Sequence, residues 1–120
     1  MKTPETIGRA GEFLVAHVLE TQDIRVTHAN VSGHDLWCRT PTGRLVSVQV
    51  KTSAQPIVHH GNALYDFSQT SFSWMPDVYA FCALDLGLMI CEASMSRRRK
   101  IRVDAFSQEN MLASVAKFFY

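Results

Sequence analysis

Three polar side chains of different chemistry are expected to meet at one end of a β-hairpin. Two predicted strands, 35–40 and 44–52, are joined by a short turn whose last residue, Gly43, suits a left-handed conformation. Side chains alternate along a strand, so this pairing directs three of them to one face. They are Asp35, Gln49 and Lys51. Carboxylate and amide oxygens are ligands that Mg²⁺ accepts, and an ammonium group can neutralise negative charge, so metal-assisted hydrolysis is one possible chemistry.

Each of these residues also has a plain structural interpretation. Lys51 could guard a strand edge against pairing with other chains. Asp35 follows Ser32-Gly33-His34 and could close a turn through side-chain hydrogen bonds. The two could also simply pair with each other. The shared face favours a functional interpretation, and a pairing shift of one residue would destroy that face.

The elements that position this hairpin follow from local patterns. A helix is predicted from the N-cap Thr3 to about residue 20, with Gly8 and Gly11 marking close packing. Its apolar stripe is predicted to contain Ile7, Ala10, Phe13, Leu14 and Val18. Further strands are predicted at 23–29, 78–84 and 88–92, and the segment 63–67 is either a strand or irregular. A last helix follows Ser107, with an apolar face of Met111, Leu112, Val115, Ala116 and Phe119.

The order of these elements predicts an α/β fold in which helices flank a central mixed β-sheet. The apolar face of the hairpin, opposite its polar face, contains Leu36, Cys38, Val46, Val48 and Val50. The chain has 120 residues, 47% of them hydrophobic, which predicts a single domain over 1–120 with a core of its own. Trp37 and Phe72 are expected in that core, whereas Trp74 lies in a predicted loop and could form an interface.

Composition excludes several classes of protein. There is no apolar run of membrane-spanning length and no apolar leader, so a cytoplasmic protein without membrane contact is expected. Cys38, Cys82 and Cys91 show no CxxC spacing, which predicts buried, reduced thiols and not a zinc site. The net charge of +1 does not indicate nucleic-acid binding by itself.

The charge is unevenly distributed, however. Arg97, Arg98, Arg99, Lys100 and Arg102 place five cations within six residues. Such a cluster could bind a phosphate backbone, which makes DNA a candidate partner. The alternative interpretation is a solvated loop or a guarded strand edge.

Motifs in the first half of the chain resemble the PD-(D/E)XK nuclease superfamily. They are Glu12 in the first helix, Ser32-Gly33-His34-Asp35 entering one strand, and Gln49-Val50-Lys51-Thr52-Ser53 ending the next. The similarity covers about residues 8–53 and is greatest to archaeal Holliday-junction resolvases and to the group I intron homing endonuclease of this fold. It implies a restriction-endonuclease-like fold and a DNA endonuclease that uses Mg²⁺ or Mn²⁺.

The resemblance also implies a role for each matching residue. Asp35, Gln49 and Glu12 would bind the metal, Lys51 would stabilise charge or position water, and Ser32 would lie near the active site. Gln49 departs from the family pattern, in which an acidic residue is usual at this position. Cutting both strands or a junction would require a homodimer or a higher oligomer. The alternatives are a catalytically idle nucleic-acid-binding module of the same fold, or an interaction protein in which Asp35 and Lys51 merely pair.

Overall fold

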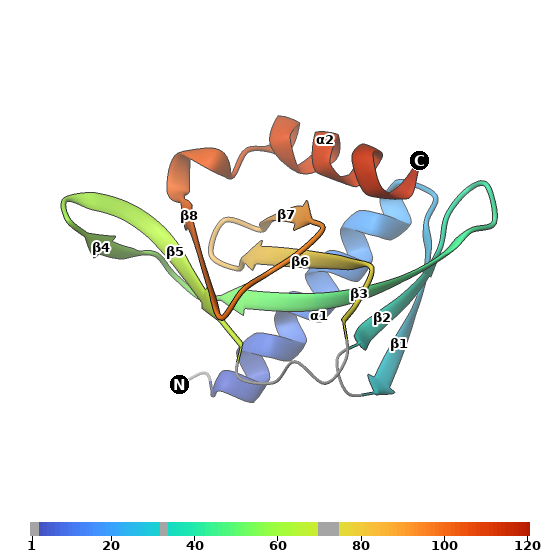
Figure 1. The fold of residues 1–120 in the computed structure, drawn as a ribbon, viewed down its shortest axis with the longest axis horizontal. Coiled ribbons are helices and arrows are strands. Elements are labelled where there is room, and N and C mark those ends of the chain that lie inside the picture. The colour runs from blue at the N-terminus through green and yellow to red at the C-terminus, as the bar shows by residue number, and fades with distance from the viewer. Residues whose placement is uncertain (1–2, 32–33, 70–74) are drawn as a thin grey trace.

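The computed structural model describes residues 3–31, 34–69 and 75–120 (Figure 1). In chain order the elements are α1 (Pro4–Thr21), β1 (Arg25–Val31), β2 (His34–Arg39), β3 (Leu45–Ser53), β4 (Ile57–His59), β5 (Asn62–Ser68), β6 (Val78–Ala83), β7 (Leu88–Glu92), β8 (Arg98–Arg102), the 3₁₀ turn Val103–Ala105 and α2 (Gln108–Phe119). Five strands form the central sheet in the order β1-β2-β3-β6-β7. The β3–β6 pair is parallel and the other pairs are antiparallel, so the sheet is mixed as predicted.

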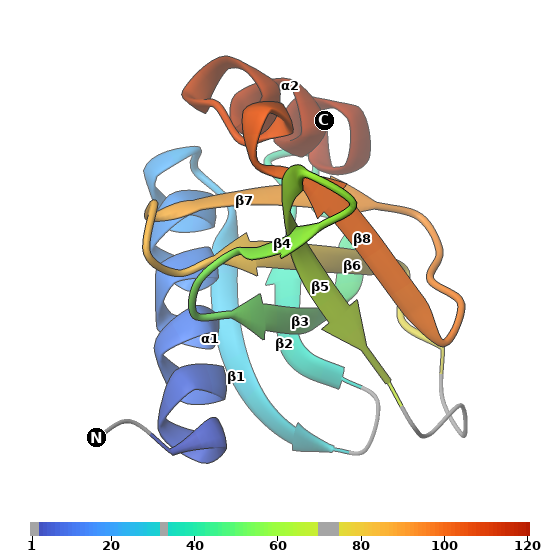
Figure 2. The ribbon, with the colours of Figure 1, turned by 90° about the vertical axis from the view of Figure 1, so that its left-hand side faces the viewer.

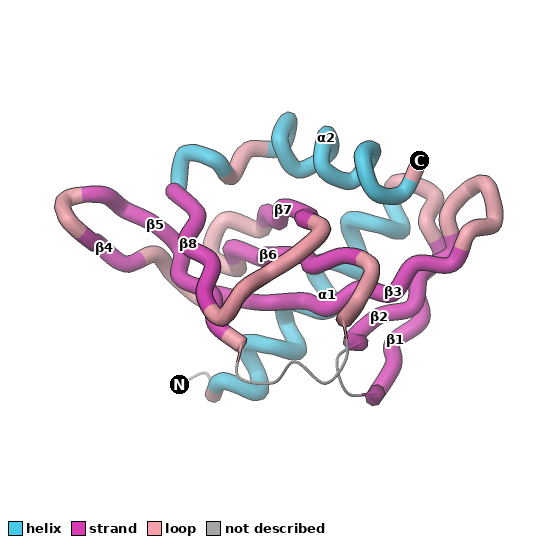
Figure 3. Tube along the Cα trace, in the orientation of Figure 1, coloured by secondary structure: helices cyan, strands magenta, loops and turns pink. Residues whose placement is uncertain are grey.

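A second sheet of three antiparallel strands, in the order β4-β5-β8, lies against the central sheet (Figures 1 and 2). Figure 3 shows how strand and loop alternate along this part of the chain. From the sequence, the segment 63–67 was either a strand or irregular, and no strand was predicted at 98–102. The strand at 63–67 is therefore confirmed, and the basic cluster belongs largely to a strand.

Two apolar clusters lie on opposite faces of the central sheet. One joins the sheet to α1 and α2, and its largest fully buried members include Leu19, Ile24 and Phe119. The other fills the space between the central sheet and the second sheet, around Tyr65 and Phe81. Because β6 lies between the two clusters, all six of its residues are buried. This burial on both faces explains the continuous apolar sequence of β6.

The first helix begins as predicted, because the Thr3 hydroxyl accepts a hydrogen bond from the N–H of Thr6 at 3.1 Å. Its buried face is rotated from the predicted stripe. Val15 and Leu19 are fully buried, whereas Phe13 is 57% exposed and was wrongly assigned to the core side. The Phe13 ring instead lies 4.9 Å from the ring of His28 on β1.

The β2–β3 hairpin has the predicted register. Trp37 pairs with Ser47 and Cys38 with Val46, and the turn is closed by a 2.8 Å hydrogen bond from the Thr40 N–H to the Arg44 carbonyl. Gly43 has a φ of 89°, the left-handed conformation that this turn requires. The alternation that predicted the polar face of this hairpin is therefore present.

Other expectations meet mixed outcomes. Trp37 is 40% exposed, so its assignment to the core is wrong, because it lies on the face of β2 opposite the α1 cluster. Ser32, Phe72 and Trp74 fall outside the described residues. All three cysteines are free and buried, and burial raises their pKa to about 12. Of the described helices, neither α1 nor α2 has the length and apolar character needed to cross a membrane.

Candidate active site

The candidate site lies where β2 parts from β3. The pairing between these strands ends at Leu36 and Val48, one pair before Asp35 would meet Gln49. Beyond that point the Asp35 carboxylate accepts a hydrogen bond from the N–H of Val50 at 2.7 Å. A side chain thus takes the place of a strand in satisfying the β3 backbone. Because β2 no longer covers this edge of β3, side chains from both sides of the sheet can reach it.

Residues from both faces of the sheet meet at this edge. Gln49 and Lys51 pair with Tyr79 and Phe81 of β6, so they point to the side of the second sheet. Glu12 comes from α1 on the other side. The helix approaches β3 closely here, because a Cβ atom added to Gly11 would overlap the side chain of Thr52. Gly11 therefore has the close packing that was predicted, whereas no described residue packs closely against Gly8.

A pocket of about 520 Å³ contains all four residues that the sequence singled out for catalysis. Its lining includes Glu12, Asp35, Gln49 and Lys51, together with Asp66 of β5. The first four are thus brought together by the fold. Asp66 was not predicted, because it belongs to a segment whose strand character was ambiguous and it lies between two buried aromatic residues.

The electrostatics of the pocket couple its charged groups. Partial burial, and then the nearby Asp35 carboxylate, raise the pKa of Glu12, while Arg9 acts in the opposite direction. Burial lowers the pKa of Lys51 and Asp35 raises it, with burial the larger effect. The ionised forms of Glu12 and Lys51 are therefore held in surroundings less favourable than water. Such perturbed groups in one pocket are typical of functional sites.

We predict that Glu12→Gln raises the melting temperature at pH 7, by about 1–4 °C. With its pKa raised by folding, protonated Glu12 contributes stability that is fully present below its ordinary value of 4.5 and lost as pH rises through the higher value of the folded protein. The neutral amide removes that loss at pH 7, so the difference from wild type should shrink below pH 4.5. Thermal melts between pH 3 and pH 8 measure this. A lower melting temperature at pH 7 would contradict it.

Further residues next to Glu12 were not singled out for the site from the sequence. Nδ1 of His28 lies 4.0 Å from the Glu12 carboxylate, and Arg9 shares a small pocket with both. These contacts depend on how α1 lies against β1, which no short motif encodes. They place two groups able to carry positive charge beside a carboxylate of the site.

The donor set suits a hard cation, although the pocket lacks a dense cluster of acidic ligands. Within the described residues, no three His, Cys, Asp or Glu side chains gather into a cluster that could hold a metal ion by themselves. Glu12 and Asp35 supply two carboxylates to the pocket. Gln49 supplies an uncharged amide oxygen at the position where a third carboxylate would complete an acidic cluster. Mg²⁺ binds through one or two carboxylates and retains several waters, so this set fits it.

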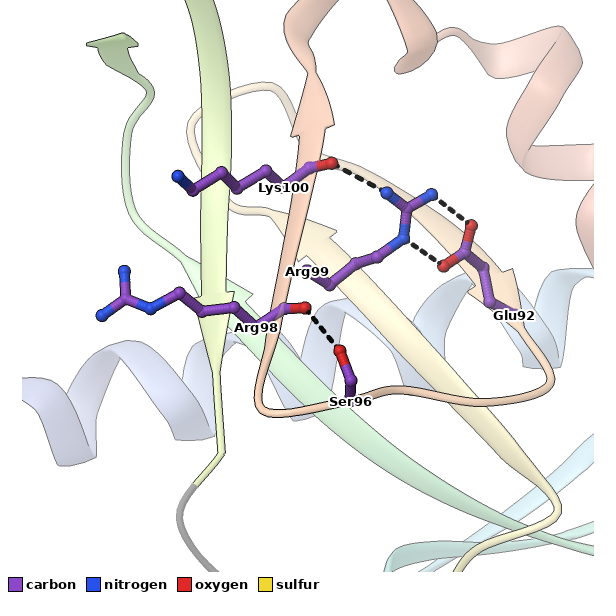
Figure 4. Close-up of polar contacts among 5 residues, drawn as sticks. All are labelled: Glu92, Ser96, Arg98, Arg99 and Lys100. Atoms are coloured by element: carbon purple, nitrogen blue, oxygen red, sulfur yellow. Dashed lines mark hydrogen bonds and ion pairs between the residues drawn. The ribbon is translucent and has the colours of Figure 1, made fainter.

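The basic cluster is divided by strand β8. In Figure 4 the side chains of Arg98 and Lys100 extend across β5, and that of Arg99 extends the other way to Glu92. Arg99 is bound in place, because Nε and Nη2 donate to the two Glu92 oxygens at 2.7 and 2.8 Å and Nη1 donates to the Lys100 carbonyl. Arg97 precedes the strand and is exposed. The cluster is therefore not one surface, and Arg99 is the least accessible of its cations to a phosphate.

Comparison with known proteins identifies the fold. No family model matches the chain, and no curated protein matches its sequence. The fold is a nuclease-like α/β arrangement of a central mixed sheet flanked by two helices, which confirms the predicted fold class. One solved structure with this likeness is the bacterial homing endonuclease I-Ssp6803I, which superposes with a TM-score of 0.70 at 15% identity, covering 85% of this chain and 77% of that one.

Proposed function

We propose that the protein is a divalent-metal-dependent DNA endonuclease of the PD-(D/E)XK type. The observation that carries the proposal is the pocket at the end of the β2–β3 ladder, where Glu12, Asp35, Gln49 and Lys51 converge. The likeness to a homing endonuclease adds support from the fold. Resolvase-like action on branched DNA is one form that this activity could take.

Asp35, Glu12 and Gln49 would hold Mg²⁺ or Mn²⁺ through oxygen ligands. When bound, such an ion polarises a phosphoryl oxygen and lowers the pKa of a water molecule. One oxygen of Asp35 already accepts the Val50 N–H, which fixes the orientation of the carboxylate. The strand edge thus holds the carboxylate rigidly before any ion arrives.

Lys51 has the position and chemistry to neutralise negative charge on a phosphoryl group under attack. Lys51 is partly buried, so its charge is screened less by water than that of a surface lysine. Arg98 and Lys100 on β8 would bind flanking phosphates, because their side chains point to the β5 side of the strand and Asp66 of β5 lines the pocket.

A cleavage panel tests the proposal. Linear duplex, single-stranded and four-way-junction DNA are incubated with the protein in Mg²⁺, Mn²⁺ or EDTA. Cleavage that requires the metal and generates a discrete product supports the proposal. Binding without cleavage of any substrate in either metal would overturn it in favour of the binding module described next.

Gln49 favours a second candidate function, a nucleic-acid-binding module of the same fold that has lost catalysis. An amide brings no charge to a cation, so the affinity of the site for metal is lower than with three carboxylates. The pocket and the cations of β8 would then serve to hold DNA alone. The cleavage panel separates the two functions, because a binding module retains DNA affinity in EDTA and gives no product.

We predict that Gln49→Glu increases the apparent affinity for Mg²⁺ by about tenfold. A carboxylate in place of the amide adds negative charge beside the ion, and a gain of ~1.4 kcal/mol corresponds to that factor. Calorimetric titration with Mg²⁺, and cleavage rates as a function of Mg²⁺ concentration, measure the change. An unchanged midpoint would place Gln49 outside the metal's ligands.

The proposal includes a homodimer or a higher oligomer. In the described residues this set of side chains lines one pocket, so one copy would present one reaction centre, and cutting two strands at one place requires two. Sedimentation of the free protein and of its DNA complex measures the number of copies. A single copy per DNA together with double-strand cleavage would contradict this part of the proposal.

A further inference from the structure

Asp66 links the basic strand β8 to the candidate active site. Its neighbours Tyr65 and Phe67 are buried in the cluster between the sheets, while Asp66 itself lines the pocket. One carboxylate oxygen, Oδ2, accepts a hydrogen bond from Nη1 of Arg98 at 2.7 Å. The other, Oδ1, is buried and has no hydrogen-bond partner among the described residues. A half-satisfied carboxylate costs stability, so its position calls for a reason other than folding.

The pairing of β5 with β8 makes this contact specific. Lys100 is the residue directly opposite Asp66, yet the ion pair is formed by Arg98, which is opposite Ser68. Arg98 therefore reaches diagonally toward the pocket. Its side chain is 64% exposed, and in the described structure one of its nitrogens is engaged by a side chain, which leaves other N–H groups for a ligand. Arg99 has less of this capacity, because three of its five N–H groups already donate to protein oxygens.

We propose that Asp66 is a positioning residue that holds the Arg98 guanidinium at the rim of the pocket, where Arg98 binds a phosphate of the DNA strand being cut. This inference rests on the proposed function, in that it takes the ligand of the pocket to be DNA. A bare Asp66 carboxylate would repel that DNA, and Arg98 neutralises it. The benefit of Asp66 is therefore the orientation it gives to a long, flexible side chain before DNA binds.

The sign of the coupling between Asp66 and Arg98 in DNA binding shows whether Asp66 helps Arg98 to bind DNA or competes with DNA for it. If Asp66 orients Arg98, removal of Arg98 costs less binding when Asp66 is already absent. If Asp66 merely competes with DNA for Arg98, removing the carboxylate frees the arginine, and its loss then costs more. A double-mutant cycle on DNA binding reports this sign directly.

The experiment measures duplex DNA binding by fluorescence anisotropy in EDTA, so that no cleavage occurs. We expect Arg98→Ala to raise Kd about tenfold in wild type and less than about threefold in the Asp66→Ala background. Equal or larger losses in that background would overturn the inference. Lys100→Ala is the matched control, since it removes one cation from the same face of β8, and its effect should be equal in both backgrounds. A coupling of Lys100 as large as that of Arg98 would also overturn the inference.

Two further measurements keep the outcomes distinct. Asp66→Asn, which preserves shape, replaces Asp66→Ala if thermal melts show that the alanine variant is unfolded, with the same expected sign. Cleavage in Mg²⁺ and Mn²⁺ is assayed on the same preparations. If the Asp66 and Arg98 substitutions are coupled in DNA binding but no cleavage occurs, the proposed nuclease activity is overturned and the positioning role remains. If cleavage occurs but the two substitutions are additive in DNA binding, the positioning role is overturned and the nuclease activity remains. No DNA binding by wild type overturns both.

Discussion

Asp35→Asn is expected to reduce metal-dependent DNA cleavage by more than about 100-fold while the protein remains folded. Loss of a residue that only orients a metal ligand already costs about 10–100-fold, and Asp35 is proposed as a ligand itself. The amide retains an acceptor for the Val50 N–H, so the edge of β3 should keep its geometry. Asp35→Ala removes that acceptor and should also lower stability, by about 1–3 kcal/mol. Cleavage rates and thermal melts of both variants measure these effects.

The matched control for Asp35 is Asp104→Asn. Asp104 is exposed, pairs with Arg102 at 3.4 Å and does not line the pocket, so its amide variant should cleave at the wild-type rate. Binding of DNA in EDTA should survive in Asp35→Asn, because the carboxylate contributes no attraction to phosphate. Wild-type cleavage by a folded Asp35→Asn protein would remove Asp35 from the site.

The polar face of the hairpin could be predicted from the sequence because it depends on local rules. A period of two along each strand, and a turn length fixed by Gly43, are sufficient to place Asp35 and Lys51 on one face. Glu12 was assigned from a family resemblance, and no periodicity links a helix residue to a strand forty residues away. Its proximity to Asp35 results from the packing of α1, which Gly11 permits.

The second sheet shows what a local pattern does not contain. The cations of β8 were recognised as a cluster in the sequence. Because side chains alternate along a strand, these cations point to two opposite faces of β8. Arg98 and Arg99 are adjacent in the chain and bind carboxylates on different strands, Asp66 of β5 and Glu92 of β7. Which carboxylate each meets is decided by the pairing of β5 with β8, across more than thirty residues.

Exposed aromatic residues were misplaced for a related reason. Phe13 was placed on the core side by its helical spacing, and Trp37 was expected in the core. Whether these two side chains are buried depends on how far the neighbouring helices and strands extend over them. Phe13 lies against His28 of β1, and Trp37 lies on the same face of β2 as Asp35. Both side chains are therefore exposed although they are large and apolar.

The contact between α1 and β3 gives the second large expected effect, on stability. Gly11→Ala should lower the melting temperature by about 4–12 °C, equivalent to ~1–3 kcal/mol of overpacking. The added Cβ would overlap Thr52, whose branched side chain is stiff and belongs to a paired strand, so the helix must move away. Because Glu12 is the next residue along, the same movement should reduce cleavage. Thermal melts and cleavage rates test both effects.

Gly8→Ala is the matched control, and its effect has the opposite sign. Among the described residues, no atom outside the local helix backbone lies within 4 Å of a Cβ added there. Gly8 is inside the same helix, so alanine should raise the melting temperature by about 2–4 °C through its better helix propensity. The double variant Gly11→Ala/Thr52→Ala should recover part of the loss, because it removes Oγ1 and Cγ2 of Thr52 from the overlap but keeps the Cβ at position 52, 2.9 Å from the added atom. Thr52 Oγ1 has no hydrogen-bond partner in the described structure, so its removal leaves no donor unpaired. Equal melting temperatures for Gly8→Ala and Gly11→Ala would mean that α1 and β3 are not in close contact at Gly11, and that Glu12 does not depend on that contact for its place beside Asp35.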